Sequence, residues 1–90
     1  MTAVLAPGEE LLVPERVIVA PALGVFQPLA PEVVTTEGEI VEEGQAIGTV
    51  TVGGEHMPIR SPFRGFLMGM LAVSGERVRE SQPVAWLRTL

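Results

Sequence analysis

Two parts of the sequence follow the same order of Pro, Gly, Glu and Gln residues. Residues 20–24 (APALG) recur as residues 61–65 (SPFRG) at an offset of 41. Residues 38–45 (GEIVEEGQ) recur as residues 75–82 (GERVRESQ) at an offset of 37, so the first copy has a loop longer by four residues. Neither copy could bury its apolar face alone. The repeat therefore predicts a quasi-twofold β structure in which two small sheets pack face to face.

Turn-forming residues divide the chain into short segments. Ten Gly and eight Pro among 90 residues leave little room for helices and favour short strands joined by turns. We expect residues 1–15 to form an N-terminal arm and residues 16–90 to form one domain. The expected strands lie near 16–20, 23–27, 40–41, 46–52, 55–60, 65–71, 78 and 84–88.

The centre of the chain is typical of a β-hairpin. Thr49–Val52 is rich in β-branched residues and is followed by Gly53-Gly54, a dipeptide suited to a two-residue turn with positive φ angles. This turn would place Val52 opposite Glu55 and Thr51 opposite His56. His56 is the only histidine, and we interpret it as a cross-strand polar partner of Thr51 rather than as a catalytic base.

Composition excludes several function classes. The chain contains no Cys and no Lys, and all six basic residues are Arg, so thiol chemistry and Schiff-base chemistry are excluded. The net charge of −5 disfavours nucleic acid as a partner, because phosphates would be repelled. The longest uncharged stretch, residues 17–31, contains three Pro and is too short to span a bilayer. With no secretory signal at the N-terminus, we expect a cytoplasmic protein without membrane partners.

The order of these motifs resembles the biotinyl/lipoyl carrier-domain family over about residues 16–88. The resemblance is carried by Ala20-Pro21…Gly24, Gly38-Glu39…Gly44-Gln45, Ser61-Pro62…Gly65 and Gly75-Glu76-Arg77-Val78…Gln82-Pro83-Val84. It implies an all-β fold: a flattened β-barrel, or barrel-sandwich hybrid, of two four-stranded antiparallel sheets. The second half looks most like the biotin carboxyl carrier branch.

Family members attach their prosthetic group to a lysine at the tip of the central hairpin, and biotin carriers typically have Ala-Met-Lys-Met there. This chain has Val52-Gly53-Gly54-Glu55, with Gly54 at the lysine position. The resemblance therefore implies that the scaffold is kept while covalent biotin or lipoate is lost. We expect no cofactor and no metal site.

Two surfaces are candidate partner sites. In the family pattern the strand at 65–73 has core positions at Leu67, Met70 and Ala72 and polar residues between them. Here the intervening positions are the apolar Phe66, Met68, Leu71 and Val73. This lost alternation indicates either an exposed partner surface or a face covered by Leu11, Leu12 and Val13 of the arm. Around the first Gly-Glu turn, Glu37, Glu39, Glu42 and Glu43 form an acidic cluster, which is either a solvated loop or a docking patch for a basic surface.

These observations lead to a non-enzymatic binding module. The resemblance implies docking, as a structural or regulatory subunit, on a larger assembly such as a biotin-dependent acyl-CoA carboxylase. A second hypothesis is a structural β protein that self-associates into a homo-oligomer through the strand at 65–73. A third hypothesis, an enzyme using Glu55 and His56 at the hairpin tip, lacks a second catalytic group at a convincing spacing.

Overall fold

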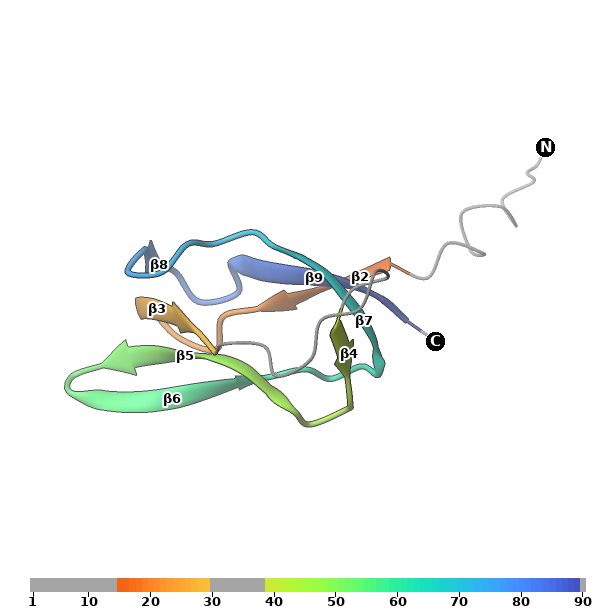
Figure 1. Cartoon of the computed structure of the whole chain (residues 1–90). Coiled ribbons are helices and arrows are strands. Elements are labelled where there is room, and N and C mark those ends of the chain that lie inside the picture. Colours follow the sequence, from red (N-terminus) through yellow and green to blue (C-terminus); the bar gives the residue numbers. More distant parts are fainter. Residues whose placement is uncertain (1–14, 30–38, 90) are drawn as a thin grey trace.

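The computed structural model describes residues 15–29 and 39–89. These residues form eight strands in two four-stranded antiparallel sheets, as predicted (Figure 1). One sheet has the order β2-β9-β7-β4 and the other β6-β5-β3-β8. The strands are β2 (Glu15–Val19), β3 (Gly24–Pro28), β4 (Glu39–Val41), β5 (Ala46–Val52), β6 (Glu55–Arg60), β7 (Gly65–Met70), β8 (Arg77–Val78) and β9 (Pro83–Thr89).

Strand positions agree with the sequence pattern to within about two residues at each end. The first strand begins at Glu15, one residue before the expected domain boundary. The rest of the expected arm, residues 1–14, lies outside the described residues. The part of the chain that the structure describes contains no helix long and apolar enough to cross a membrane.

The two sheets are related by the repeat seen in the sequence. The offset of 41 carries β2 onto β6 and β3 onto β7, and the offset of 37 carries β4 onto β8 and β5 onto β9. Applying this exchange to the order β2-β9-β7-β4 gives β6-β5-β3-β8, which is the order of the second sheet. The predicted quasi-twofold symmetry is therefore present in the strand pairing itself.

The core lies between the sheets and follows the same symmetry. Equivalent residues of the two copies are both fully buried, as for Ile18 with Ile59 and Val41 with Val78. The buried apolar residues are Ile18, Ala20, Phe26, Val41, Ile47, Val50, Ile59, Ala72, Val78, Val84, Ala85 and Leu87. They come from both sheets, which form a flattened sandwich rather than one closed barrel.

Equivalent turns precede the last strand of each copy. The backbone N–H of Glu42 donates to Oε1 of Gln45 over 2.9 Å, and the N–H of Arg79 donates to Oε1 of Gln82 over 3.0 Å. Each glutamine thus satisfies a backbone donor of its own turn. Both turns also pass through a positive φ angle, at Gly44 in one copy and at Ser81 in the other.

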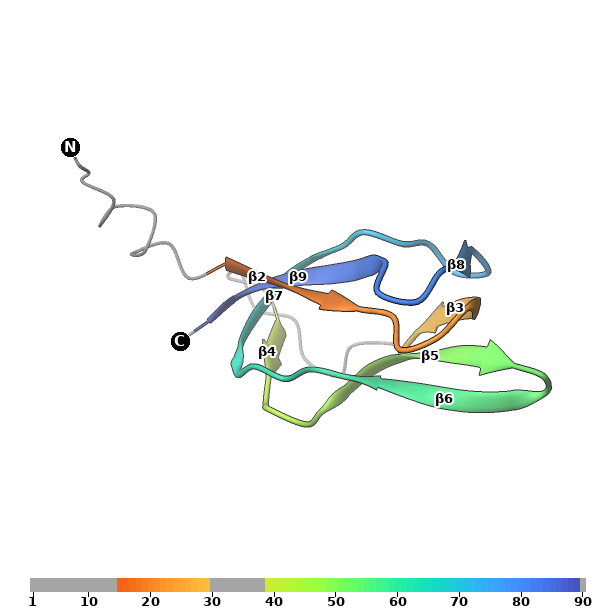
Figure 2. The same ribbon diagram turned by 180° about the vertical axis from the view of Figure 1, so that it is seen from behind.

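The β5–β6 hairpin projects at one end of the molecule, and β9 ends at the other (Figures 1 and 2). The hairpin is held by pairing along its whole length and by the β3–β5 ladder beside it. This architecture fixes the hairpin tip on a rigid sheet. It also leaves the outer side of the β2-β9-β7-β4 sheet as a second exposed surface.

Candidate functional site

The first candidate site is the tip of the β5–β6 hairpin, formed by Val52, Gly53, Gly54 and Glu55. Val52 pairs with Glu55, and the next pair inward is Thr51 with His56, as the sequence predicts. Gly53 has φ of 55° and Gly54 has φ of 86°, both in the left-handed region that this two-residue turn requires. All four tip residues are exposed, and a Cβ on either glycine would meet nothing within 4 Å.

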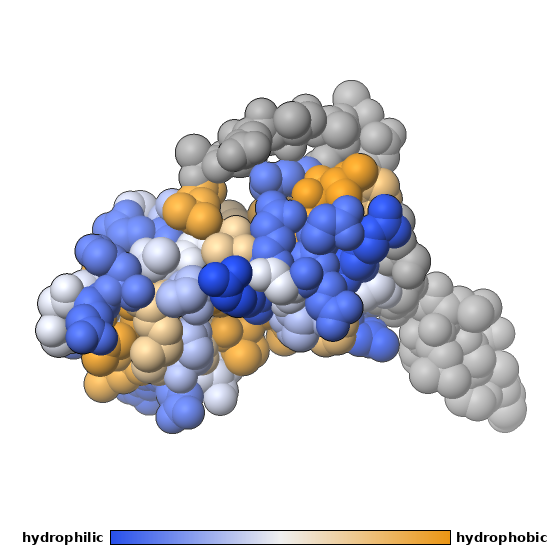
Figure 3. All heavy atoms as spheres, turned by 90° about the horizontal axis from the view of Figure 1, so that it is seen from below, coloured by the Kyte–Doolittle hydropathy of each residue, from blue (hydrophilic) through white to orange (hydrophobic). Residues whose placement is uncertain are grey.

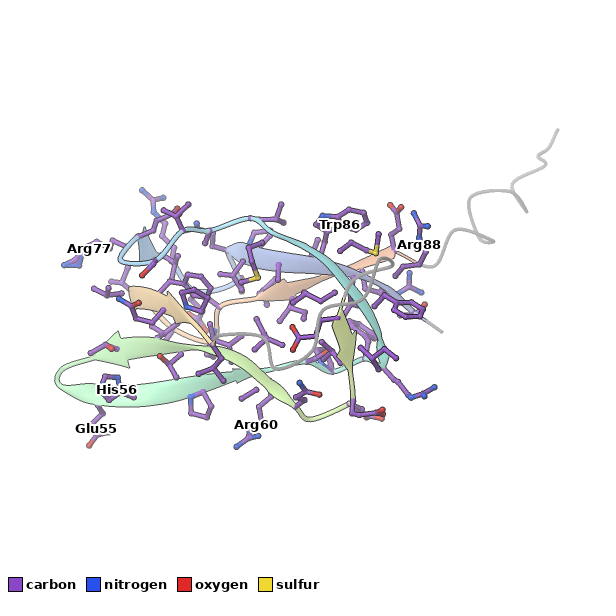
Figure 4. All side chains as sticks on the ribbon, in the orientation of Figure 1. Glu55, His56, Arg60, Arg77, Trp86 and Arg88 are labelled. Carbon is purple, nitrogen blue, oxygen red and sulfur yellow. The ribbon has the colours of Figure 1, made fainter. Side chains whose placement is uncertain are left out.

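His56 lies one pair behind the turn (Figure 4). Its Nδ1 is 3.0 Å from Oγ1 of Thr51 on the opposite strand, so the predicted cross-strand partnership is confirmed. Its ring is exposed. Among the described residues, no cluster of three His, Cys, Asp or Glu side chains is placed to hold a metal ion.

The tip carries no side chain able to accept an acyl group as an amide. Gly54 has no side-chain atoms, and the whole sequence contains no lysine. The remaining polar groups at the tip are the Glu55 carboxylate and the backbone. An exposed, stiff turn of this kind can be recognised by a partner surface.

The second candidate site is the outer side of the β2-β9-β7-β4 sheet. Across three adjacent strands, Val17 pairs with Trp86 and Trp86 with Gly69, so these residues share one face. The indole lies against Gly69, because a Cβ there would be 2.9 Å from Nε1 of Trp86. Figure 4 shows Trp86 on the side of β9 turned away from the β5–β6 hairpin. We name the surface formed by Val17, Leu71 and Trp86 the Trp86 face.

The Trp86 face is hollowed. An open groove of about 520 Å³ is lined by Glu15, Arg16, Val17, Leu71 and Trp86. Val17 is 49% exposed and Leu71 is 51% exposed, while Trp86 is half-buried. On the opposite side of the molecule, hydrophilic side chains separate the exposed apolar ones (Figure 3). The pairing of Trp86 with Val17 and Gly69 places the indole on this outer face.

The predicted apolar strand is exposed at several of its positions. Met68 is 37% exposed, Leu71 51% and Val73 69%, whereas Phe66 is half-buried. The side chains are therefore available on the surface, and their role in binding a partner stays a prediction. The alternative cover by Leu11, Leu12 and Val13 lies outside the described residues.

The expected core positions of this strand are only partly correct. Leu67 packs against the core and Ala72 is buried, but Met70 is 39% exposed, so its core assignment is wrong. The β7–β9 pairing contains an irregularity between Leu67 and Gly69, which shifts the register of the residues that follow. Met70 is the last residue of β7 and pairs with Ala85 of β9.

The acidic cluster is divided by the fold. Glu39 is half-buried on β4, whereas Glu42 and Glu43 are exposed in the turn that follows. The carboxylate of Glu42 accepts from Nε of Arg64 over 2.9 Å, in an exposed ion pair. Such pairs contribute at most about 1 kcal/mol, but this one neutralises part of the expected patch. Glu37 lies outside the described residues.

Comparison with known proteins finds similarity at the level of structure. No protein-family model and no curated protein sequence matches the chain. The urea carboxylase of Kluyveromyces lactis matches with a TM-score of 0.68 and 22% identity, over 81% of this chain and 6% of the carboxylase. A single-chain, multi-domain long-chain acyl-CoA carboxylase matches with a TM-score of 0.65 and 16% identity, over 100% of this chain and 8% of that protein. The chain thus shares its fold with a small segment of each carboxylase.

Proposed function

We propose that this chain is a carrier-like binding module without a covalent cofactor that docks, as a structural or regulatory subunit, on a carboxylase assembly. The observation that carries the proposal is the hairpin tip. It is an exposed turn in a fold shared with segments of two carboxylases, and the sequence resemblance implies that Gly54 stands at the position of a carrier's lysine. A carrier moves a tethered group between active sites by raising its local concentration. Without the tether, the module can occupy a carrier's docking place but can deliver nothing.

The docking surface in this proposal combines the tip with apolar residues of the segment 65–73, of which Phe66 is half-buried and the others are exposed. The tip residues are Val52, Gly53, Gly54 and Glu55, and the apolar residues are Phe66, Met68, Leu71 and Val73. The acidic residues Glu39, Glu42 and Glu43 would add charge complementarity toward a basic partner surface. No residue is assigned a catalytic role.

Affinity capture from the native host tests the proposal. The tagged wild-type chain should recover carboxylase subunits, and its intact mass should show no biotinyl or lipoyl group. Leu71→Glu should lose the partner while keeping the same far-UV spectrum, since Leu71 is 51% exposed. The surface control is Glu80→Gln, which lies in an exposed turn. Thr49→Glu is less suitable, because Thr49 lies in the central β5 strand. Recovery of no carboxylase subunit would remove this function.

A second candidate function is self-association, and the exposed Trp86 face favours it. A symmetric dimer would bury Val17 and Leu71 of one copy against those of the other. Light scattering during size-exclusion chromatography decides this point. A mass that stays at one chain across a hundredfold range of concentration would exclude the homo-oligomer.

A further inference from the structure

The internal repeat places equivalent residues on the outer sides of the two sheets. On the β2-β9-β7-β4 sheet, one row of paired residues crosses all four strands and consists of Glu15, Arg88, Phe66 and Ile40. The offsets of 41 and 37 carry this row onto a row of the β6-β5-β3-β8 sheet, which consists of His56, Thr51, Val25 and Arg77. The fold thus contains its own comparison between two outer sides.

The two outer sides differ in polarity. In this row, Ile40 stands at the position that Arg77 has on the other sheet. In the neighbouring row, Trp86 stands at the position of Thr49. Because the solvated side of an antiparallel sheet normally carries polar residues, the first of these sides has the composition of a surface that another protein covers. This outer apolar face, which includes the Trp86 face, consists of Val17, Ile40, Phe66, Leu71 and Trp86.

The outer apolar face is large enough for a reversible interface. Val17 is 49% exposed, Ile40 45% and Leu71 51%, while Phe66 and Trp86 are half-buried. Four strands about 4.8 Å apart and the seven residues of β9 at about 3.4 Å each make this side of the sheet about 20 Å by 24 Å. Two such faces in contact bury about 1,000 Å² in total, which is the range of weak and reversible complexes.

Charge favours a second copy as the occupant. Glu15 and Arg88 lie on this side of the sheet and pair with each other over 3.2 Å, so their charges cancel. The other charged residues on the described strands of this sheet are Arg16 and Glu39, which pair with core-packed leucines and therefore lie on the inner side. The chain has a net charge of −5, but its outer apolar face is neutral. Two copies can thus meet at this face without like-charge repulsion, whereas a strongly charged partner would gain nothing from it.

We propose that the outer apolar face packs against the same face of a second copy of this chain, about a twofold axis. Each residue of such an interface is buried twice, once in each copy. The β5–β6 hairpin belongs to the other sheet, so the Gly53-Gly54 turns of both copies stay uncovered. This dimer rests on the second candidate function, self-association, and does not depend on docking to a carboxylase.

Two matched variants test which face is buried. Val17→Glu puts a carboxylate on the outer apolar face, and Val25→Glu makes the same replacement on the outer side of the other sheet, where Val25 is 36% exposed. Sedimentation velocity of wild type over a hundredfold range of concentration should give a mass that rises from one chain toward two. If one buried carboxylate weakens association about tenfold, Val17→Glu weakens it about a hundredfold, because the twofold interface contains the substitution twice. Val25→Glu should dimerise as wild type does.

Trp86 reports on the same contact, because it is the only tryptophan and lies in the outer apolar face. Acrylamide quenching of its emission should fall as the concentration of wild type or Val25→Glu rises. For Val17→Glu, quenching should stay constant over the same range. This measurement identifies the face that becomes covered, which the mass alone does not.

Four results would overturn the proposal. A wild-type mass of one chain at every concentration removes the dimer and self-association with it. Equal loss of the dimer in both variants means that added charge, and not the position of Val17, is responsible. Equal dimerisation of both variants, or a dimer in which quenching of Trp86 does not fall, leaves self-association but places the interface elsewhere. Should Val17→Glu fail to fold by far-UV circular dichroism, Ile40→Glu provides the same comparison, since Ile40 is 45% exposed.

Dimerisation and docking exclude each other, and this consequence rests on the proposed function. Phe66 and Leu71 belong both to the outer apolar face and to the docking surface proposed for a carboxylase. Captured complexes measured by light scattering should therefore hold this chain as a monomer at each docking site, and a chain bound there as a dimer would overturn the exclusion. If no carboxylase binds, the proposed function fails while the sedimentation result on the dimer stands.

Discussion

Introducing the carrier motif Ala-Met-Lys-Met at the hairpin tip tests whether Gly54 stands at the lysine position. The variant carries Val52→Ala, Gly53→Met, Gly54→Lys and Glu55→Met. Gly53 and Gly54 have φ angles of 55° and 86°, and each non-glycine residue placed in this region costs about 1–2 kcal/mol. A Cβ on either glycine meets nothing within 4 Å, so no steric cost is added. The total loss is about 2–4 kcal/mol.

The domain should tolerate this loss. Chains of this length are stable by about 5–13 kcal/mol when each residue contributes roughly 0.05–0.15 kcal/mol. Most molecules of the variant therefore stay folded, and denaturant unfolding should give a lower midpoint with an unchanged slope. The strand pairing behind the turn, from Thr51 with His56 inward, is not altered by the substitutions.

The assay is intact-mass measurement after incubation with a biotin protein ligase, biotin and ATP. We expect one biotinyl group on the lysine variant. The control carries Gly54→Arg with the same three neighbours, because a guanidinium has the same charge but is not acylated by the ligase. A folded lysine variant that gains no more biotin than the arginine control would refute the assignment of Gly54. Modification of a variant with lysine at Gly53 instead would place the register one residue away.

Three further predictions concern stability and are checked by chemical unfolding. Gly65→Ala should lower the free energy of unfolding by about 3 kcal/mol, because its Cβ would lie 2.9 Å from backbone atoms of β9. Gly44→Ala, in open space at φ of 87°, should lower it by about 1–2 kcal/mol. Equal losses in the two variants would contradict the steric argument. Gln45→Ala and Gln82→Ala should each cost about 1 kcal/mol and add in the double variant, since they cap separate turns. Ser61→Ala should cost about 1–3 kcal/mol, because its buried hydroxyl both donates and accepts a backbone hydrogen bond; an unchanged midpoint would show that these bonds contribute nothing.

The sequence was sufficient to predict the strand positions, the quasi-twofold symmetry and the hairpin tip. The two offsets of the repeat decide which strands are equivalent, and the Gly53-Gly54 dipeptide decides the register of the hairpin. The signal from the dipeptide is local, since a turn with positive φ admits few residue types. The glutamine at the end of each repeated motif caps its own turn in the structure, and its spacing from the N–H that it binds is the same in both copies.

The outer face could not be predicted in the same way. The β7–β9 pairing is irregular between Leu67 and Gly69, and no residue type in β7 indicates this irregularity. A shift of one residue reverses the face on which a side chain lies. The groove beside Trp86 further depends on which residues of β2 lie next to β9, a long-range pairing between opposite ends of the chain.

The pairing of Glu15 with Arg88 gives the molecule two different poles. Under the quasi-twofold exchange, the place where β9 ends and β2 begins corresponds to the β5–β6 turn. One end of the molecule is thus the closed β5–β6 turn, while at the other end the chain enters β2 and leaves β9. A protein fused to this domain would be attached at the end where β2 begins and β9 ends. The Gly53-Gly54 turn would then lie at the opposite end and point away from the junction.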